Sequence, residues 1–176
     1  MTITAIKNAV TEVLPPVTPE AYREGMSSLA AAVNVVTTTG PEGHAGFTAT
    51  AVCSVSDNPA TLLVCLNRGA SVHQVFKNST HLVINTLTSQ HQLISNTFGG
   101  KAPMNERFEI GDWVESTTGC PRLADAAVSF DCIITDVKSV ATHDVIFCQV
   151  VDIKQDPEAD ALLYYQRGYH SACKDA

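Results

Sequence analysis

Residues 126–153 read AAVSFDCIITDVKSVATHDVIFCQVVDI. Two long runs rich in Val, Ile, Phe and Cys are separated only by the short turn ATHD at 141–144, and such residues favour strands. A turn this short joins antiparallel neighbours, because parallel strands need a crossover of about a dozen residues or more. The stretch therefore predicts two long antiparallel strands and, with them, an antiparallel sheet.

Further strand-like runs lie before and after this pair. They cover residues 32–39, 47–55, 61–67, 81–87 and 161–170. The first two form a hairpin around a Gly/Pro turn. Short helices are expected at 71–79 and 89–98, with an irregular loop at 99–113. Because helices do not alternate regularly with strands, a doubly wound parallel sheet is disfavoured. The sequence predicts a mainly β protein, an antiparallel barrel with a few peripheral helices.

A longer helix is expected at 18–32, TPEAYREGMSSLAAA. Thr18 is a candidate N-cap, because its hydroxyl can accept a backbone N–H of the first turn. Tyr22, Met26 and Leu29 fall on one face at helical spacing. The pattern predicts an amphipathic helix ahead of the strands.

Composition limits the partners and the location. The chain has 176 residues, 45% of them hydrophobic and 16% charged, and a formal net charge of −7. It has no Lys/Arg cluster, so neither nucleic acid nor an anionic membrane surface is an expected partner. No apolar segment reaches the ~18 residues of a membrane span, and no signal-peptide pattern occurs, so a cytoplasmic location is expected. Residues 1–17 are expected to form an N-terminal arm and residues 18–176 a single domain.

Standard catalytic signatures are missing from the sequence. It contains no G-x-G-x-x-G after a strand, no P-loop, no G-x-S-x-G and no H-E-x-x-H. The six histidines are scattered, and the six cysteines lack C-x-x-C or zinc-site spacing. Four cysteines lie in apolar runs, which indicates reduced core residues in preference to metal ligands or disulfides. No catalytic protein group and no metal site are expected. If the protein is an enzyme, a bound cofactor supplies the reactive atoms.

The stretch at 46–56, GFTATAVCSVS, is unusually rich in small and hydroxylated residues. A strand that only filled a core would carry larger apolar residues, because stabilisation by burial scales with area. Small side chains let a ligand approach the backbone, and hydroxyls offer it hydrogen bonds. The alternative is an ordinary strand whose Thr and Ser residues face water.

Residues 65–72, CLNRGASV, lead from a strand end into the helix expected at 71–79. Ser71 is the candidate N-cap, and free N–H groups at a helix start favour an anion. Arg68 could add a charge-assisted hydrogen bond to a phosphate. The alternative is a capped turn with a solvated arginine.

Nine segments of the chain follow one another in the order and spacing of a known group. They read AAVNVVTT, GFTATAVCSVS, LLVCLNRGAS, LVINTL, FGGK…ERF, TGCPRL, VSFDCII, THDVIFCQV and LLYYQRGYH. On these segments, within residues 20–170, the chain resembles the small flavin reductases of the FMN-binding split-barrel family. These are the reductase components of two-component flavin-dependent monooxygenases.

The resemblance implies a fold, an activity and partners. The fold is a Greek-key split antiparallel β-barrel, and the activity is NAD(P)H-dependent reduction of FMN or FAD by hydride transfer, with NADH preferred. Reduced flavin then diffuses to a separate flavin-dependent oxygenase component. A homodimer is also implied, and the runs 82–87 and 126–134, apolar on both faces, agree with one.

Two other interpretations stay open. One is a flavin-dependent reductase of a corrinoid or ferric chelate. The other is a non-enzymatic split barrel that binds flavin or haem, or that scaffolds an oxygenase.

The resemblance also assigns ten residues to the flavin. They are Phe47 and Thr48 along the isoalloxazine ring, Thr50 and Ala51 at the ring edge or ribityl chain, Cys65, Leu66, Asn67, Ser71 and Val72 around the phosphate, and Phe98 near the flavin. From the residues alone, Phe98 is equally suited to core packing. Asn85, a polar residue in an apolar strand, needs a buried partner and is expected to brace a bulge or to orient a loop beside the flavin.

Four further residues are assigned by the resemblance to the nicotinamide nucleotide: His143, Tyr165, Arg167 and Gly168. Family members commonly carry Gly-Asp before the histidine, where this chain has Ala141 and Thr142. The alternatives are a solvent-facing histidine in a hairpin turn and an amphipathic edge strand.

Overall fold

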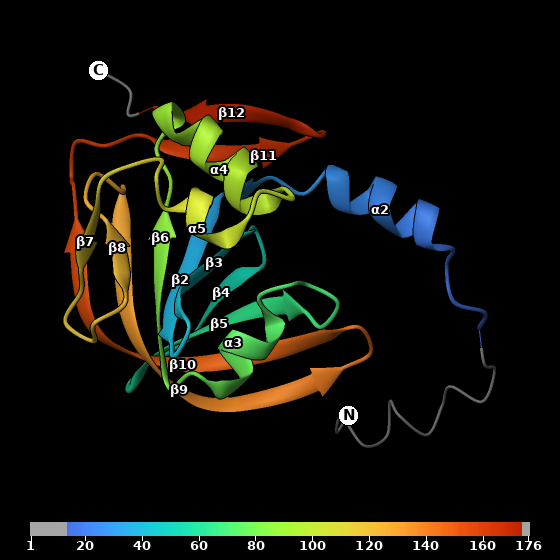
Figure 1. The fold of residues 1–176 in the computed structure, drawn as a ribbon. Helices are drawn as coiled ribbons and strands as arrows, with labels where there is room; N and C mark the ends of the chain where they lie inside the picture. The colour runs from blue at the N-terminus through green and yellow to red at the C-terminus, as the bar shows by residue number, and fades with distance from the viewer. Residues whose placement is uncertain (1–13, 174–176) are drawn as a thin grey trace.

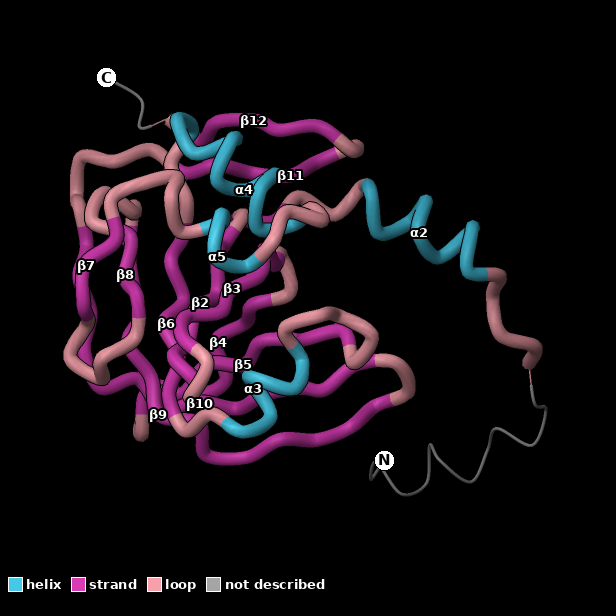
Figure 2. Tube along the Cα trace, in the orientation of Figure 1, coloured by secondary structure: helices cyan, strands magenta, loops and turns pink. Residues whose placement is uncertain are grey.

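The computed structural model describes residues 14–173, about half of which lie in antiparallel strands, with short helices at the periphery (Figures 1 and 2). The helices are α2 (Pro19–Ser27), α3 (His73–Asn78), α4 (Gln92–Gly99) and α5 (Met104–Arg107), with a 3₁₀ turn η1 (Ser89–His91). The strands are β1 (Ala31–Ala32), β2 (Asn34–Gly40), β3 (Gly43–Ala49), β4 (Val52–Asp57), β5 (Ala60–Asn67), β6 (His81–Thr86), β7 (Trp113–Glu115), β8 (Pro121–Leu123), β9 (Val128–Val140), β10 (His143–Gln155), β11 (Ala161–Tyr165) and β12 (Gly168–Ala172). The predicted class, mainly β with a few helices, is confirmed. The longest described helix has nine residues, too few to cross a bilayer.

Seven strands pair in one antiparallel sheet, in the order β3-β2-β6-β9-β10-β5-β4. The long pair predicted from the sequence is confirmed, since β9 and β10 run antiparallel over their whole lengths, from the turn to the Gln155–Val128 pair. Two register irregularities interrupt their pairing, and bulges of this kind bend and twist a strand. A three-stranded sheet, β1-β11-β12, and the pair β7-β8 complete the described strands.

The two edge strands of the large sheet lie close together. These strands, β3 and β4, are at opposite ends of the strand order, yet only Thr50 and Ala51 join them along the chain. Two residues can connect opposite edges only if the sheet curls until the edges approach each other. Within residues 14–173, β3 and β4 are not paired with one another, so the curled sheet is split along this line. The split falls in the stretch of small residues that begins at Gly46.

The apolar residues on both faces of β6 are covered within one chain. Leu82, Val83 and Ile84 are all fully buried, with Leu82 and Ile84 in the core cluster that also contains Phe47 and Leu66. A second cluster packs α4 against β2, β8 and β11. The apolar pattern of β6, which the sequence suggested a second subunit would cover, therefore gives no argument for a dimer.

The helix expected at 18–32 ends early, because Ala31–Ala32 form β1 and pair with β11. Thr18 is the N-cap as predicted, with its hydroxyl accepting the Ala21 N–H at 3.2 Å. Pairing with a neighbouring strand outweighs the helix propensity of the alanines, as tertiary contacts commonly do. The arm expected at 1–17 falls mostly outside the described residues, and the domain division stays a prediction.

Three further segments differ from the sequence-based expectation. The single strand expected at 47–55 is divided at Thr50 and Ala51 between β3 and β4. The loop expected at 99–113 contains the short helix α5. The strand expected at 161–170 is instead the hairpin β11–β12, which turns at Gln166 and Arg167. Both turn residues have positive φ, 47° and 61°, as two-residue hairpin turns of type I′ require.

The cysteines are free thiols that only partly occupy the core. Cys132 and Cys148 are buried as expected, and Cys120 is buried as well. Cys53 is exposed, so its assignment to the core is wrong. It lies on the edge strand β4, which has a neighbouring strand on one side only.

Asn85 joins three neighbouring segments, which confirms that it has buried partners. Its pairings with β2 and β9 carry no register shift, so the bulge that it was expected to brace is not found there. Its amide nitrogen donates to the Val35 carbonyl at 3.1 Å, and its amide oxygen accepts the Leu123 N–H at 2.9 Å and the Ser129 hydroxyl at 3.0 Å. The side chain is fully buried. It therefore joins β2, β6, β8 and β9 at one point.

Candidate functional site

A cavity of about 410 Å³, here called the inner cavity, lies at the split in the sheet. Its walls come from the end of β3, the β3–β4 connection, the end of β5, the loop into α3, and the end of α4. All ten residues assigned to a flavin line it: Phe47, Thr48, Thr50, Ala51, Cys65, Leu66, Asn67, Ser71, Val72 and Phe98. Its size falls within the range of about 300–1,000 Å³ typical of small-molecule sites.

The lining of the inner cavity combines apolar side chains with polar groups. Phe47, Leu66 and Phe98 are its bulky apolar residues, and each is at most 8% exposed. Gly46 permits this packing, because a Cβ there would lie 2.7 Å from the Phe98 ring. The Thr48 hydroxyl donates to the Ser95 carbonyl at 2.7 Å and so holds α4 against β3. Small residues in this stretch therefore make room for the Phe98 ring as well as for the cavity itself. The residues present fit a flavin.

The start of α3 differs from the sequence-based prediction. The helix begins at His73 with Val72 at the N-cap position and no capping side chain, so Ser71 is not the N-cap. The His73 N–H donates to the Ala70 carbonyl at 3.0 Å and closes a turn ahead of the helix. A helix of six residues contributes little dipole, so the predicted anion-binding helix start is weak. The exposed Ser71 still lines the inner cavity.

Arg68 is directed to the β9–β10 turn. Its Nη1 donates to the Ala141 carbonyl at 3.4 Å, and its backbone N–H donates to the Thr142 carbonyl at 2.9 Å. Its Nε lies 3.9 Å from the Asp144 carboxylate. Arg68 therefore supports this turn, and it is not among the described residues that line the inner or the outer cavity; its contact with a phosphate stays a prediction.

Asp144, the second residue of β10, links α3 to the ends of β9 and β10 beside their turn. Its two carboxylate oxygens bond the Ser139 hydroxyl and His73 Nε2, each at 2.7 Å. These hydrogen bonds, the one from Ser139 first, hold the pKa of Asp144 below its usual range. Because the pKa is lowered on folding, the cluster stabilises the protein at neutral pH and weakens as the pH falls below about 4.

Arg107 also lines the inner cavity, and the sequence analysis did not single it out. It is only 5% exposed, and it donates to the carbonyls of Ala102 (3.0 Å), Gly46 (3.1 Å), Phe98 (2.9 Å) and Gly100 (3.0 Å). Burial lowers the pKa of Arg107. Its one sequence signal was its place in the segment FGGK…ERF. Arg107 ties β3 to the end of α4 and to the loop that follows.

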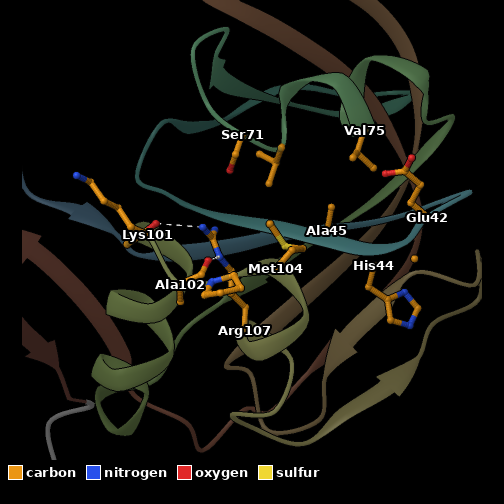
Figure 3. A pocket seen from close by; sticks show the side chains of 13 residues that line it. Glu42, His44, Ala45, Ser71, Val75, Lys101, Ala102, Met104 and Arg107 are labelled. Atoms are coloured by element: carbon orange, nitrogen blue, oxygen red, sulfur yellow. Dashed lines mark hydrogen bonds between the residues drawn. The ribbon is translucent and has the colours of Figure 1, made fainter.

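A second cavity of about 640 Å³, here called the outer cavity, adjoins the inner one (Figure 3). The two share four lining residues: Ser71, Val72, Gly100 and Arg107. In Figure 3, Ser71 and Val75 come from the α3 wall, with Arg107 and Met104 from α5 on the opposite wall. Glu42 and His44 lie at one end and Lys101 at the other.

A groove of about 670 Å³, here called the side groove, also reaches the split. It shares three residues with the inner cavity: Thr50, Ala51 and Cys65. Its other walls come from α2, β4, β5 and the β11–β12 hairpin. The β3–β4 connection therefore borders both hollows.

The β11–β12 hairpin brings only part of the expected nicotinamide set to the side groove. Arg167 lines the groove, and its guanidinium pairs with Glu24 on α2 at 2.5 Å. Tyr164 lines it as well, whereas the Tyr165 ring packs against His170, with centroids 5.9 Å apart. Successive residues of a strand face opposite sides, so Tyr164 and not Tyr165 borders the side groove, and the contact of Tyr165 with a nicotinamide nucleotide stays a prediction.

His143 lies at another end of the site. It is the first residue of β10 and pairs with Asn67 of β5, which lines the inner cavity. The His143 side chain is exposed. His143 is not among the described residues that line the inner cavity, the outer cavity or the side groove. Gly168 begins β12 just after the hairpin turn. The structure therefore does not bring His143 and Arg167 into one cavity.

The fold and the site together define a small antiparallel β protein whose split sheet holds a pocket suited to a flavin. The sequence model of the "Flavin reductase like domain" family matches residues 26–172. The chain belongs to this family.

Individual relatives agree with this assignment. The chain is 51% identical over 157 residues to an FMN reductase (NADH) RutF of Enterobacter cloacae, a match that covers 89% of the chain and 96% of the relative. A putative flavin reductase of Haemophilus somnus has a similar crystal structure, with a TM-score of 0.87, 46% identity, and coverage of 89% of this chain and 100% of that one. Nitrilotriacetate monooxygenase component B of Mycobacterium thermoresistibile is also similar, with a TM-score of 0.81, 25% identity, and coverage of 86% and 85%.

Proposed function

We propose that the protein is an NADH-dependent flavin reductase that reduces FMN or FAD and passes the reduced flavin to a separate oxygenase component. The observation that carries the proposal is the convergence of all ten expected flavin residues on one cavity at the split in the sheet. Family membership and the names of the relatives support it. The cytoplasmic location expected from the sequence is part of the same proposal.

The protein contributes mainly orientation. When bound, the flavin supplies the redox chemistry by accepting a hydride from a reduced nicotinamide. Phe47, Leu66 and Phe98 would support the flavin ring by apolar contact. Thr50 and Ala51 border both the inner cavity and the side groove, so a nicotinamide bound in the groove would lie next to a flavin bound in the cavity. Bringing the reacting atoms to about 3–3.5 Å lowers the barrier without an acid or base.

Steady-state consumption of NADH tests the proposal. We expect consumption only when free FMN or FAD is added, and oxygen as the final acceptor in the absence of an oxygenase. No consumption with either flavin contradicts the proposal. Consumption that needs an added cobalt or ferric complex under anaerobic conditions identifies the corrinoid or ferric-chelate reductase instead.

Replacing Arg167 with Ala is expected to raise the KM for NADH by about tenfold, or about 1.4 kcal/mol, with little change in flavin affinity. The reason is that a guanidinium suits a diphosphate, and Arg167 lines the groove and not the inner cavity. Glu24→Gln is the matched control, because it breaks the same ion pair and keeps the guanidinium. Equal effects of the two substitutions, or a loss of flavin binding, contradict this role.

We also propose that the protein is a homodimer. The apolar face of α2 is open to solvent, with Tyr22 60%, Met26 44% and Leu29 61% exposed, and this helix projects from the body of the molecule (Figure 1). The side groove lies beside it, and a second copy can cover both. Light scattering is expected to give twice the chain mass of 18.8 kDa. A monomer at micromolar concentration contradicts the proposal.

A further inference from the structure

The junction between the inner and outer cavities holds a cation without an acidic partner. Arg107 is 5% exposed and lines both cavities. Within residues 14–173, its only polar partners are backbone carbonyls, and none of the ion pairs includes it. Burying a charge is costly unless a counter-charge or hydrogen bonds compensate for it. The carbonyls supply hydrogen bonds but no negative charge.

The guanidinium also has unused hydrogen-bonding capacity. It carries five N–H groups, and its four hydrogen bonds to carbonyls use Nε, both N–H groups of Nη1 and one of Nη2. One Nη2–H is left for a ligand. Across the outer cavity, Ser71 projects from the opposite wall (Figure 3), and its hydroxyl is exposed to the same junction. The positively charged Arg107 guanidinium thus faces the neutral Ser71 hydroxyl, and both can donate a hydrogen bond to a ligand at the junction.

We propose that Arg107 is the charge partner of the flavin phosphate, which lies at the junction between Arg107 and Ser71. This inference rests on the proposed function, because it identifies the group that recognises one part of its ligand. The resemblance assigns Phe47 and Thr48 to the ring and Ser71 to the phosphate, and Ser71 lines the junction, so the phosphate end is directed to it. A phosphate monoester carries a charge of about −1.5 to −2 near pH 7, and a protein of net charge −7 needs a local cation to hold it. Arg107 provides this charge where the helix start of α3 does not.

The geometry distinguishes this role from a merely structural one. As a structural tie, Arg107 positions Gly46, Phe98 and the loop after α4, and its loss would affect every flavin alike. As a charge partner, it favours FMN over riboflavin, which has the same ring and no phosphate. The ratio of the two dissociation constants therefore reports the charge contact and not the tie.

Dissociation constants of FMN and riboflavin, measured by flavin fluorescence quenching, test the inference in three variants. Arg107→Gln is expected to weaken FMN binding by about 10- to 100-fold, the size of a hydrogen bond to a charged group, and riboflavin binding by less than about threefold. Arg107→Lys keeps the charge and is expected to keep most of the preference for FMN. Arg68→Gln is the matched control, because Arg68 is an arginine directed to the β9–β10 turn. This substitution is expected to leave the ratio of the FMN and riboflavin dissociation constants unchanged.

Equal losses of affinity for FMN and riboflavin in Arg107→Gln overturn the inference. It is also overturned if Arg107→Lys loses the preference for FMN over riboflavin as fully as Arg107→Gln does. If Arg107→Gln does not fold, the wild-type protein still decides. Inorganic phosphate is expected to compete with FMN and not with riboflavin, beyond the effect of sodium chloride at the same ionic strength. Phosphate that acts no better than chloride overturns the inference. Equal wild-type affinity for FMN and riboflavin also overturns it, whereas failure to bind either flavin contradicts the proposed function itself.

Discussion

Replacing Ala51 with Trp is expected to abolish flavin binding and NADH-dependent flavin reduction, with a loss of affinity of about 100-fold or more, or about 2.7 kcal/mol. Ala51 is exposed at the split and lines both the inner cavity and the side groove. An indole there occupies the space where flavin and nicotinamide meet. Because the position is exposed, the substitution should not disturb the core.

The matched control is Ala60→Trp, which adds the same indole to an exposed position at the start of β5, outside these hollows. Flavin titration and NADH oxidation should be close to wild type in this variant, and the thermal midpoints of both variants should remain near that of wild type. If Ala51→Trp binds FMN as the wild type does, the cavity at the split is not the flavin site.

Replacing Asn85 with Ala is expected to lower the free energy of unfolding by about 2–4 kcal/mol, measured by urea denaturation. The reason is that the buried Leu123 N–H, Ser129 hydroxyl and Val35 carbonyl all lose a partner. Asn78→Ala, at the exposed end of α3, should change stability by no more than about 0.5 kcal/mol.

The same variant separates bracing from a binding role. Below its unfolding transition, Asn85→Ala should bind FMN with wild-type affinity, because Asn85 lies among β2, β8 and β9 and not in the inner cavity. Wild-type stability together with weakened FMN binding would show instead that Asn85 acts on the flavin.

Parts of the fold were predictable where the signal is local. The strands of residues 126–153 carry their own apolar pattern and a short turn, so their pairing follows from the sequence. The helix at 18–32 was predicted too long because its end is decided by a contact with β11, a partner far along the chain. Which residues cover the apolar faces of β6 and α2 depends likewise on tertiary packing.

The candidate site divides in the same way. Its ten assigned flavin residues lie in two short segments and at Phe98, which the family resemblance identified, and the folded chain gathers them around one cavity. Arg107 was missed because its partners are backbone carbonyls from β3, α4 and a loop, which leave no pattern in the sequence. Tyr164, which lines the side groove, was not singled out, because the resemblance assigned its neighbour Tyr165 and a shift of one residue on a strand reverses the face.

The most direct test of the central claim is anaerobic mixing of the FMN-loaded protein with one equivalent of NADH, while the absorbance of oxidised flavin and of NADH is followed. If the inner cavity holds a flavin that accepts hydride from a nicotinamide in the side groove, both absorbances should decay together in a single turnover. Ala51→Trp should show neither decay. Bound flavin that stays oxidised in the presence of NADH would contradict the account.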